Sequence, residues 1–235
     1  QIIAPWQNRL PADAPNRFLL NIQPGQAAPL AERLQSAGVE QARIMPMVRG
    51  RLVALNGAAV RSEDFDDPET RRWIDRDFNL SSAATLPEDN ELIEGRFWPA
   101  DTTTPEISVD TYAVERLKLK LGSTLTLDFA GDPRQYTVSS IREVQWDTMQ
   151  PNFFLLVPPS ALPQEQANLL TSYYLPPEST ALDRELIRSY PNLTLLDLDS
   201  LLGEIRLITG RALLALQLIF GFTLLSGTLL VATML

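Results

Sequence analysis

The sequence predicts a mixed α+β fold: a split ferredoxin-like domain, a small β-barrel-like module inserted into it, and one long helix at the end. Three observations predict this. A β-α-β pattern opens the chain, a second one precedes the last helix, and short alternating strands dominate the residues between them. The chain of 235 residues can hold one large domain or two small ones. We therefore expect the split domain at 1–78 and 161–199, and the inserted module at 79–160.

The first β-α-β pattern is marked by clear turn and cap signals. Its predicted elements are a strand at 18–22, a helix at 30–37, a strand at 42–55 and a helix that begins at 68. Gly38 is expected to end the first helix, because glycine readily adopts the left-handed conformation found there. Asn56-Gly57 is the strongest local signal, a two-residue hairpin turn. Asp67 and Pro68 read as a helix cap and a first-turn proline.

The inserted module and the second β-α-β pattern follow in order. Strands are expected at 124–129, 135–144 and 153–157, with a short helix at 110–117. The second pattern then consists of a strand at 171–175, a helix opened near Thr180, and a strand at 193–198. Thr180 and Asp183 have the spacing of a capping box, so we expect them to cap that helix.

Residues 212–235 contain no charged side chain and predict a transmembrane helix. A hydrocarbon core about 30 Å thick needs about 20 apolar residues in a helix. The alternative is a buried core helix, which is disfavoured because apolar runs of about 10–14 residues are the usual length for such helices. No Lys or Arg follows the run, so we expect the natural protein to continue beyond Leu235. Thr223 and Gly227 have the small-xxx-small spacing that lets a second membrane helix approach closely.

The last helix is expected to begin before the membrane. Ser200 is the predicted N-cap. Leu201, Ile205 and Ile208 follow it at the spacing of one helix face. Residues 200–211 would then form a stiff stalk that is continuous with the membrane helix. Leu201, Ile205 and Ile208 are therefore the candidate coupling residues.

Composition excludes several kinds of chemistry. The chain has no Cys and no His, so disulfides are impossible and zinc would be held by carboxylates alone. Its net charge of −9 argues against nucleic-acid binding, which needs a basic face. No P-loop, G-x-S-x-G or S-x-x-K motif occurs. We predict no catalytic residue, no cofactor and no metal site in this chain.

One acidic cluster contains the type of side chain that binds calcium. It consists of Glu63, Asp64, Asp66 and Asp67. Carboxylate oxygens suit Ca²⁺, but a solvated loop followed by a helix cap explains the same residues and is favoured.

Several motifs, in order along the chain, resemble the MacB/FtsX/LolC superfamily of ABC transporter permeases, in its YbbP-like branch. They are WQNRLPADAPNRFLLNI (6–22), MVRGRLVALNG (47–57), RDFNL (76–80), GRFW (95–98), ISVDTYAVERLKLKLGSTLTLDF (107–129), VSSIREVQWDTMQPNFFLLVPPSAL (138–162) and LTLLDLDSLL (193–202). The most distinctive stretch is WDTMQPNFFLLV at 146–157. On its residues alone it is a strand-to-strand crossover with a structural role. The resemblance is to the second of the two large periplasmic domains in that branch.

The resemblance implies a ferredoxin-like porter part with an inserted sabre part, lying between two membrane helices. It places the protein in the bacterial inner (cytoplasmic) membrane, with residues 1–200 in the periplasm. It implies a non-catalytic permease subunit, with ATP and Mg²⁺ held by a separate cytoplasmic ABC ATPase subunit. Members relay ATP-driven motion to their periplasmic domains, a process called mechanotransmission. Membrane lipids and a periplasmic esterase of the lysophospholipase type are implied partners.

Two functions therefore stay open. The favoured one is a permease domain that couples ATP hydrolysis to the export or extraction of hydrophobic or lipid-like compounds. The alternative is a membrane-anchored regulatory module that binds and activates a periplasmic hydrolase without transport. A transporter should display an apolar cavity continuous with the membrane helices, whereas a regulator needs only an apolar or acidic docking patch. An anchored enzyme has no constellation of residues to support it.

Overall fold

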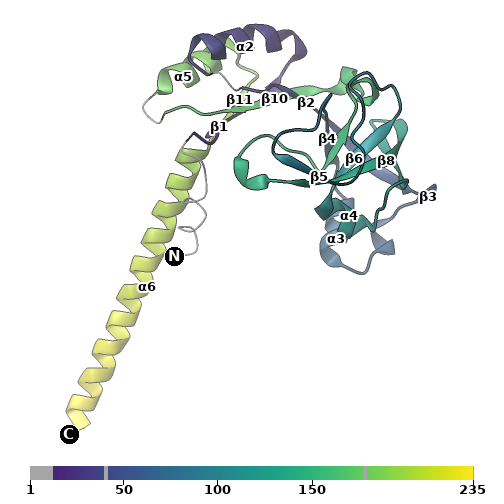
Figure 1. Ribbon diagram of the computed structural model, residues 1–235. Helices are drawn as coiled ribbons and strands as arrows, with labels where there is room; N and C mark the ends of the chain where they lie inside the picture. The colour runs from purple at the N-terminus through teal and green to yellow at the C-terminus, as the bar shows by residue number, and fades with distance from the viewer. Residues whose placement is uncertain (1–12, 40–41, 177–178, 235) are drawn as a thin grey trace. The chain divides into compact units, whose positions relative to one another are not determined.

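The computed structural model describes residues 13–39, 42–176 and 179–234, and for part of the last helix it describes the backbone only. The chain divides into two compact units, residues 1–195 and 196–235. The predicted mixed α+β class is confirmed (Figure 1).

The helices and strands have the following bounds. The strands are β1 (Arg17–Ile22), β2 (Met45–Leu55), β3 (Ala58–Ala59), β4 (Phe78–Ser82), β5 (Asn90–Gly95), β6 (Glu106–Asp110), β7 (Thr124–Phe129), β8 (Asp132–Val144), β9 (Leu155–Val157), β10 (Asn168–Tyr173) and β11 (Thr194–Asp197). The helices are α2 (Ala27–Ser36), α3 (Pro68–Ile74), α4 (Thr111–Leu117), α5 (Thr180–Ser189) and α6 (Leu198–Met234). A short 3₁₀ turn, η3 (Trp146–Thr148), lies between β8 and β9.

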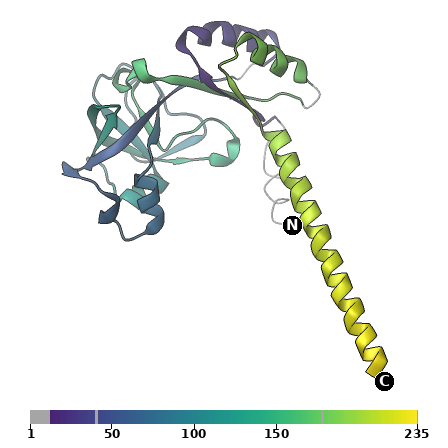
Figure 2. The same ribbon diagram turned by 180° about the vertical axis from the view of Figure 1, so that it is seen from behind.

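One part of the first unit is a layer of strands covered by two helices, which we call the helix-covered layer. Its strand order is β11-β1-β10-β2, and β10 is antiparallel to both of its neighbours. Helices α2 and α5 lie on the same side of these strands (Figures 1 and 2). The helices pack onto the strands through a core that includes Leu19, Leu34, Tyr173 and Leu186. Both β-α-β patterns of the sequence are therefore present.

The other part is a closed barrel of β2, β4, β9, β6, β8 and β7. Each strand pairs with the next in this order, and β7 pairs back with β2. Closure removes exposed strand edges around the ring. A β-barrel is therefore present, as predicted, but its strand β2 lies outside the predicted module at 79–160. Strand β2 belongs to both parts: residues 45–47 pair with β10 of the helix-covered layer, and the residues from Val48 onward pair with barrel strands. Val48 is accordingly the first residue of the barrel's core cluster. The division at residues 78 and 160 stays a prediction, since the first unit spans both positions.

The turn and cap signals of the first half are confirmed. Asn56 and Gly57 have φ of 51° and 79°, as a tight hairpin turn between β2 and β3 requires. Gly38 follows α2 with φ of 84°. Asp67 caps α3, because its carboxylate accepts the backbone N–H groups of Glu69 and Thr70. These signals act within a few residues, so the rest of the fold does not overrule them.

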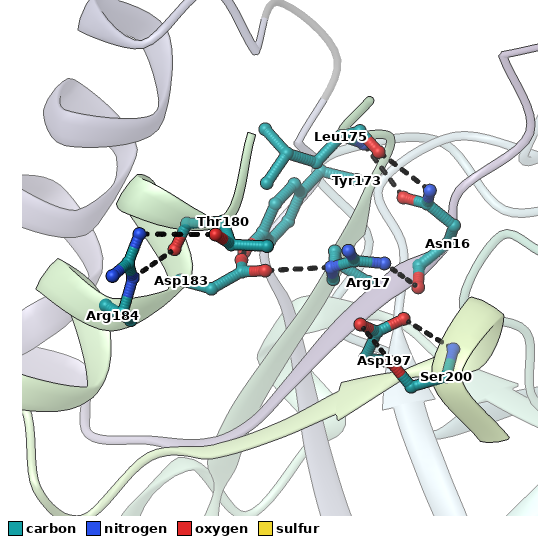
Figure 3. Close-up of polar contacts among 9 residues, drawn as sticks. All are labelled: Asn16, Arg17, Tyr173, Leu175, Thr180, Asp183, Arg184, Asp197 and Ser200. Carbon is teal, nitrogen blue, oxygen red and sulfur yellow. Dashed lines mark hydrogen bonds and ion pairs between the residues drawn. The ribbon is translucent and has the colours of Figure 1, made fainter. Parts of the chain in front are cut away.

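Two other predicted caps are wrong. The N-cap of α5 is Ser179, and Asp183 lies buried in an ion pair instead of capping that helix. Helix α6 begins at Leu198, two residues before the predicted N-cap. Ser200 is inside the helix, where its backbone N–H and its hydroxyl both donate to the carboxylate of Asp197, at 3.1 and 2.8 Å (Figure 3). Asp197 therefore does the capping.

The second unit contains α6, which runs without a break from Leu198 to Met234. It is continuous over both the predicted stalk and the predicted membrane segment. In the portion of the chain that the structure describes, no helix combines the length and the apolarity needed to cross a membrane. The predicted transmembrane span at 212–235 is therefore not confirmed. The exposed large apolar side chains of the described part of α6 are Leu201, Leu207, Ile208, Leu213, Leu216, Ile219 and Phe220.

Candidate functional site

A groove of about 520 Å³ opens on the first unit between the helix-covered layer and the barrel. Its volume lies within the range of about 300–1,000 Å³ that is usual for small-molecule sites. Its lining is mainly apolar and aromatic, and consists of Phe18, Leu20, Met47, Trp73, Arg76, Asp77, Phe78, Asn79, Trp146, Met149, Gln150, Pro151, Asn152, Phe153, Phe154 and Leu170. The groove thus includes most of the distinctive 146–157 stretch.

One wall of the groove comes from strand β1 and its neighbours. Side chains alternate along a strand, so Arg17 and Leu19 are buried on one face while Phe18 and Leu20 are half-buried on the other. Phe18 and Leu20 line the groove, together with Leu170 of β10. The same alternation that fills the core beneath α2 and α5 therefore supplies an apolar wall on the opposite face.

The other wall is a cluster of aromatic rings on the barrel. Trp73 meets Phe78 and Phe154 edge-on, with ring centroids 4.6 and 5.7 Å apart. Phe154 also lies against Tyr112 at 5.4 Å and Trp146 at 4.8 Å. Edge-on and offset ring pairs stabilise such clusters beyond simple burial. Trp146 is 44% exposed, so it presents a large apolar surface where a ligand can reach it.

A buried polar network holds the loop that carries these rings. Arg142 of β8 is fully buried and donates to Asn90 Oδ1 at 2.7 Å and to the carbonyl oxygen of Phe153. Asn152 donates to the carboxylate of Asp89, which precedes Asn90 in the chain. Burial lowers the pKa of Arg142 to about 10, because the charged form is poorly solvated there. The loop is therefore fixed from beneath.

A second buried network fixes β1 (Figure 3). Arg17 Nε donates to Asp183 Oδ2 at 2.9 Å, and the Tyr173 hydroxyl donates to the other oxygen of Asp183 at 3.1 Å. Burial, followed by the nearby Asp183 charge, raises the pKa of Tyr173. Asn16 exchanges two hydrogen bonds with the backbone of Leu175, each 2.8 Å long. These contacts tie β1 to β10 and α5, and so hold the wall formed by Phe18 and Leu20.

Sequence reasoning missed these groups. The spacing in the sequence predicts a helix cap at Asp183, and no motif points to Arg17 or Arg142. The motif that did point here is the 146–157 stretch, although its residues alone indicated a structural role. An arginine inside an alternating strand, at a position that should face the core, is the signal that could have found Arg142.

The five predicted stalk and packing residues lie elsewhere, on α6. Leu201 is 45% exposed and Ile208 is 67% exposed. The Thr223 hydroxyl donates to the carbonyl oxygens of Ile219 and Phe220, one turn earlier in the helix. The side-chain environment of Ile205 and the surroundings of Gly227 lie outside the described residues. A coupling or packing role for this set stays a prediction.

The acidic cluster considered for calcium is used in local structure. Asp67 caps α3, as described above, and is also 3.2 Å from Arg116. Asp64 accepts the backbone N–H of Arg61 at 2.9 Å. These contacts are those of a loop followed by a helix cap.

Comparison with known proteins gives the class. No protein-family model matches the chain. An ABC transporter permease aligns with it at 30% identity over 227 residues, which is 96% of the chain. The chain is therefore similar, over almost its whole length, to a segment of an ABC transporter permease, the class of protein that its motifs indicated.

The permease that aligns is YbbP of Escherichia coli (strain K12), itself described as uncharacterized, and the chain spans 27% of its length. A crystal structure assigned to a domain of a permease protein from Porphyromonas gingivalis superposes with a TM-score of 0.41 at 15% identity. That superposition covers 78% of this chain and 91% of the other. Overlap this low does not establish a common fold.

Proposed function

We propose that this chain is a non-catalytic part of an ABC permease subunit, and that its groove binds hydrophobic or lipid-like compounds during their export or extraction. The observation that carries the proposal is the groove itself. Its walls are apolar and aromatic, and two buried arginine networks hold both walls in place. A purely regulatory module would need no such cavity, so the groove favours transport.

The architecture supports a finer assignment. Two β-α-β halves with strand order β11-β1-β10-β2 suit a split ferredoxin-like porter part, and the closed barrel suits an inserted sabre part. The uncharged segment 212–235 and the exposed apolar side chains of α6 favour a stalk that enters the bacterial inner membrane. Leaving apolar surface in water costs about 25 cal/mol per Å², so these side chains call for lipid or protein around them. Residues 1–200 would then lie in the periplasm.

In this proposal the energy comes from a separate cytoplasmic ABC ATPase subunit, which holds ATP and Mg²⁺. Helix α6 relays its motion, with Leu201, Ile205 and Ile208 on the coupling face. Thr223 and Gly227 would let a neighbouring membrane helix approach. An unbroken helix suits this task, because each residue adds a hydrogen bond that resists bending.

The groove is tested by ligand binding to the full chain in nanodiscs of neutral lipid. The probe is N-phenyl-1-naphthylamine, a neutral fluorophore that brightens in apolar sites. Trp146→Ala should weaken probe binding about 5-fold, since truncating an aromatic anchor costs about 1 kcal/mol or more. Ile187→Ala is the control, because Ile187 is an exposed apolar residue on α5 outside the groove. Equal probe binding by wild type and Trp146→Ala would contradict the proposal that the groove is the ligand-binding site.

The relay is tested in the reconstituted complex with its ATPase. Proline inside a helix removes a hydrogen bond and clashes with the preceding turn, at a cost of about 3 kcal/mol. Ile205→Pro should therefore leave ATP hydrolysis running while transport falls, and Ile205→Leu should behave as wild type. A Pro variant that stays fully coupled would reduce α6 to a tether.

A further inference from the structure

We infer that the groove selects single-chain amphiphiles with an anionic headgroup, and that Arg76 recognises that charge. This inference rests on the proposed function and names the ligand class. The occupant we expect is a monomeric long-chain carboxylate.

The groove contains one uncompensated charge. Arg76 and Asp77 are the two charged residues in its lining, in the turn between α3 and β4. Asp77 accepts from Arg51 Nε at 3.3 Å, so its carboxylate already has a cation beside it. Within the described ranges Arg76 is exposed and takes part in no ion pair. A ligand that enters the groove therefore meets a free guanidinium.

A guanidinium in the groove can select an anionic ligand over a neutral or cationic one through direct contact. Its planar fork of N–H donors matches the two oxygens of a carboxylate. The chain as a whole has a net charge of −9, so its long-range field repels an anion. That field is screened beyond about 8 Å at physiological ionic strength. Selection of an anion must therefore come from a short-range partner, and Arg76 supplies one.

The apolar lining suits one flexible alkyl chain. Met47 and Met149 have unbranched side chains that adjust to different shapes. Leu20 and Leu170 add aliphatic surface, and Trp146 adds a rigid, partly exposed ring. Adaptable side chains beside a permanent positive charge favour a ligand whose tail varies and whose head is constant.

The experiment uses displacement of N-phenyl-1-naphthylamine from the full chain in phosphatidylcholine nanodiscs. Three amphiphiles with twelve-carbon chains compete below their micelle concentrations: dodecanoate, the neutral monododecanoylglycerol, and dodecyltrimethylammonium. Empty nanodiscs correct for partition into lipid. Dodecanoate should bind about 3- to 10-fold more tightly than the neutral compound, as expected for a partly exposed charge-assisted contact. The cationic compound should bind most weakly.

Two variants locate the selection. Arg76→Gln should abolish the preference for dodecanoate over the neutral compound. Arg72→Gln is the matched control, because Arg72 is an exposed arginine of α3 that donates to Pro68 O and is not in the lining. It should keep the full preference. Thermal unfolding of both variants checks that they fold as wild type does.

The outcomes separate the two proposals. If none of the three amphiphiles displaces the probe, the groove is not a ligand site and the proposed function fails with the inference. If all three compete equally, or if Arg76→Gln keeps the preference, only the inference is overturned. Binding that appears solely when anionic lipid is added to the nanodiscs would indicate a membrane-surface contact and would also overturn it.

Discussion

The helix-covered layer and the barrel each bury an arginine, but the two arginines have different partners. In the helix-covered layer, Arg17 donates to the carboxylate of Asp183 at 2.9 Å. In the barrel, Arg142 donates to neutral oxygens, those of the Asn90 side chain and the Phe153 backbone. Its Nε atom is buried without a hydrogen-bond partner among the described residues.

This difference shows how each region is held together. The Arg17–Asp183 pair joins β1 to α5, which are 166 residues apart in the chain, so a charge pair links separate elements. The barrel is closed by strand pairing, and Arg142 only tethers a loop to it. Removing Asp183 takes a carboxylate away from the buried Arg17 guanidinium, whereas removing Arg142 takes away the buried cation itself. The two regions should therefore respond differently to substitution.

The largest effect is expected for Asp183→Ala. It removes the carboxylate beside the buried Arg17 guanidinium and the acceptor of the Tyr173 hydroxyl. Breaking one side of a buried ion pair costs about 3–5 kcal/mol, so the free energy of unfolding should fall by about 3 kcal/mol. Denaturant unfolding of the full chain measures it. Asp183→Asn, which keeps acceptor capacity, should fall between this variant and wild type. A loss below about 1 kcal/mol in Asp183→Ala would show that the Arg17–Asp183 ion pair does not hold the helix-covered layer together.

A smaller effect is expected for Arg142→Met. The buried Asp110 carboxylate loses a nearby positive charge, and Asn90 Oδ1 and the carbonyl oxygen of Phe153 each lose a donor. Unsatisfied buried acceptors cost about 1–3 kcal/mol, so we expect a loss of about 2 kcal/mol. The loop beside Trp146 should also loosen, which a shift in tryptophan emission would report. Asp183→Ala should produce no comparable shift at the groove. The same shift in both variants would contradict separate roles for the two networks.

The smallest effect is expected for Glu185→Gln, two residues beyond Asp183 on the same helix. Glu185 pairs with Arg33 of α2, and the hydrogen bond from Arg33 lowers the pKa of Glu185. Both side chains are well exposed, and exposed ion pairs stabilise little. The unfolding midpoint should not change detectably. A clear loss of stability would show that the helix-covered layer depends on surface charges as well as on its buried pair.

Local signals account for the parts of the fold that were predicted well. Asn56-Gly57 needs only its own backbone angles to turn the chain, and Asp67 reaches N–H groups two and three residues away. The alternation of Thr124–Phe129 is visible in its six residues, and it appears as β7 with the same bounds. The prediction for Asp183 is wrong because its spacing from Thr180 suits a cap. Its actual partners, Arg17 and Tyr173, lie 166 and 10 residues away in the chain, beyond the reach of a local pattern.

The sequence by itself determined the mixed α+β class, the two β-α-β patterns, a barrel-like β module and a long last helix, because all of these follow from periodicity and from neighbours along the chain. Only the tertiary structure decided that the barrel closes, since pairs such as β2 with β7 and β4 with β9 join distant segments. It alone assembled the groove, whose walls come from β1, α3, β10 and the loop after β8. Contacts between such segments depend on how whole elements pack, and no local pattern of residues encodes them.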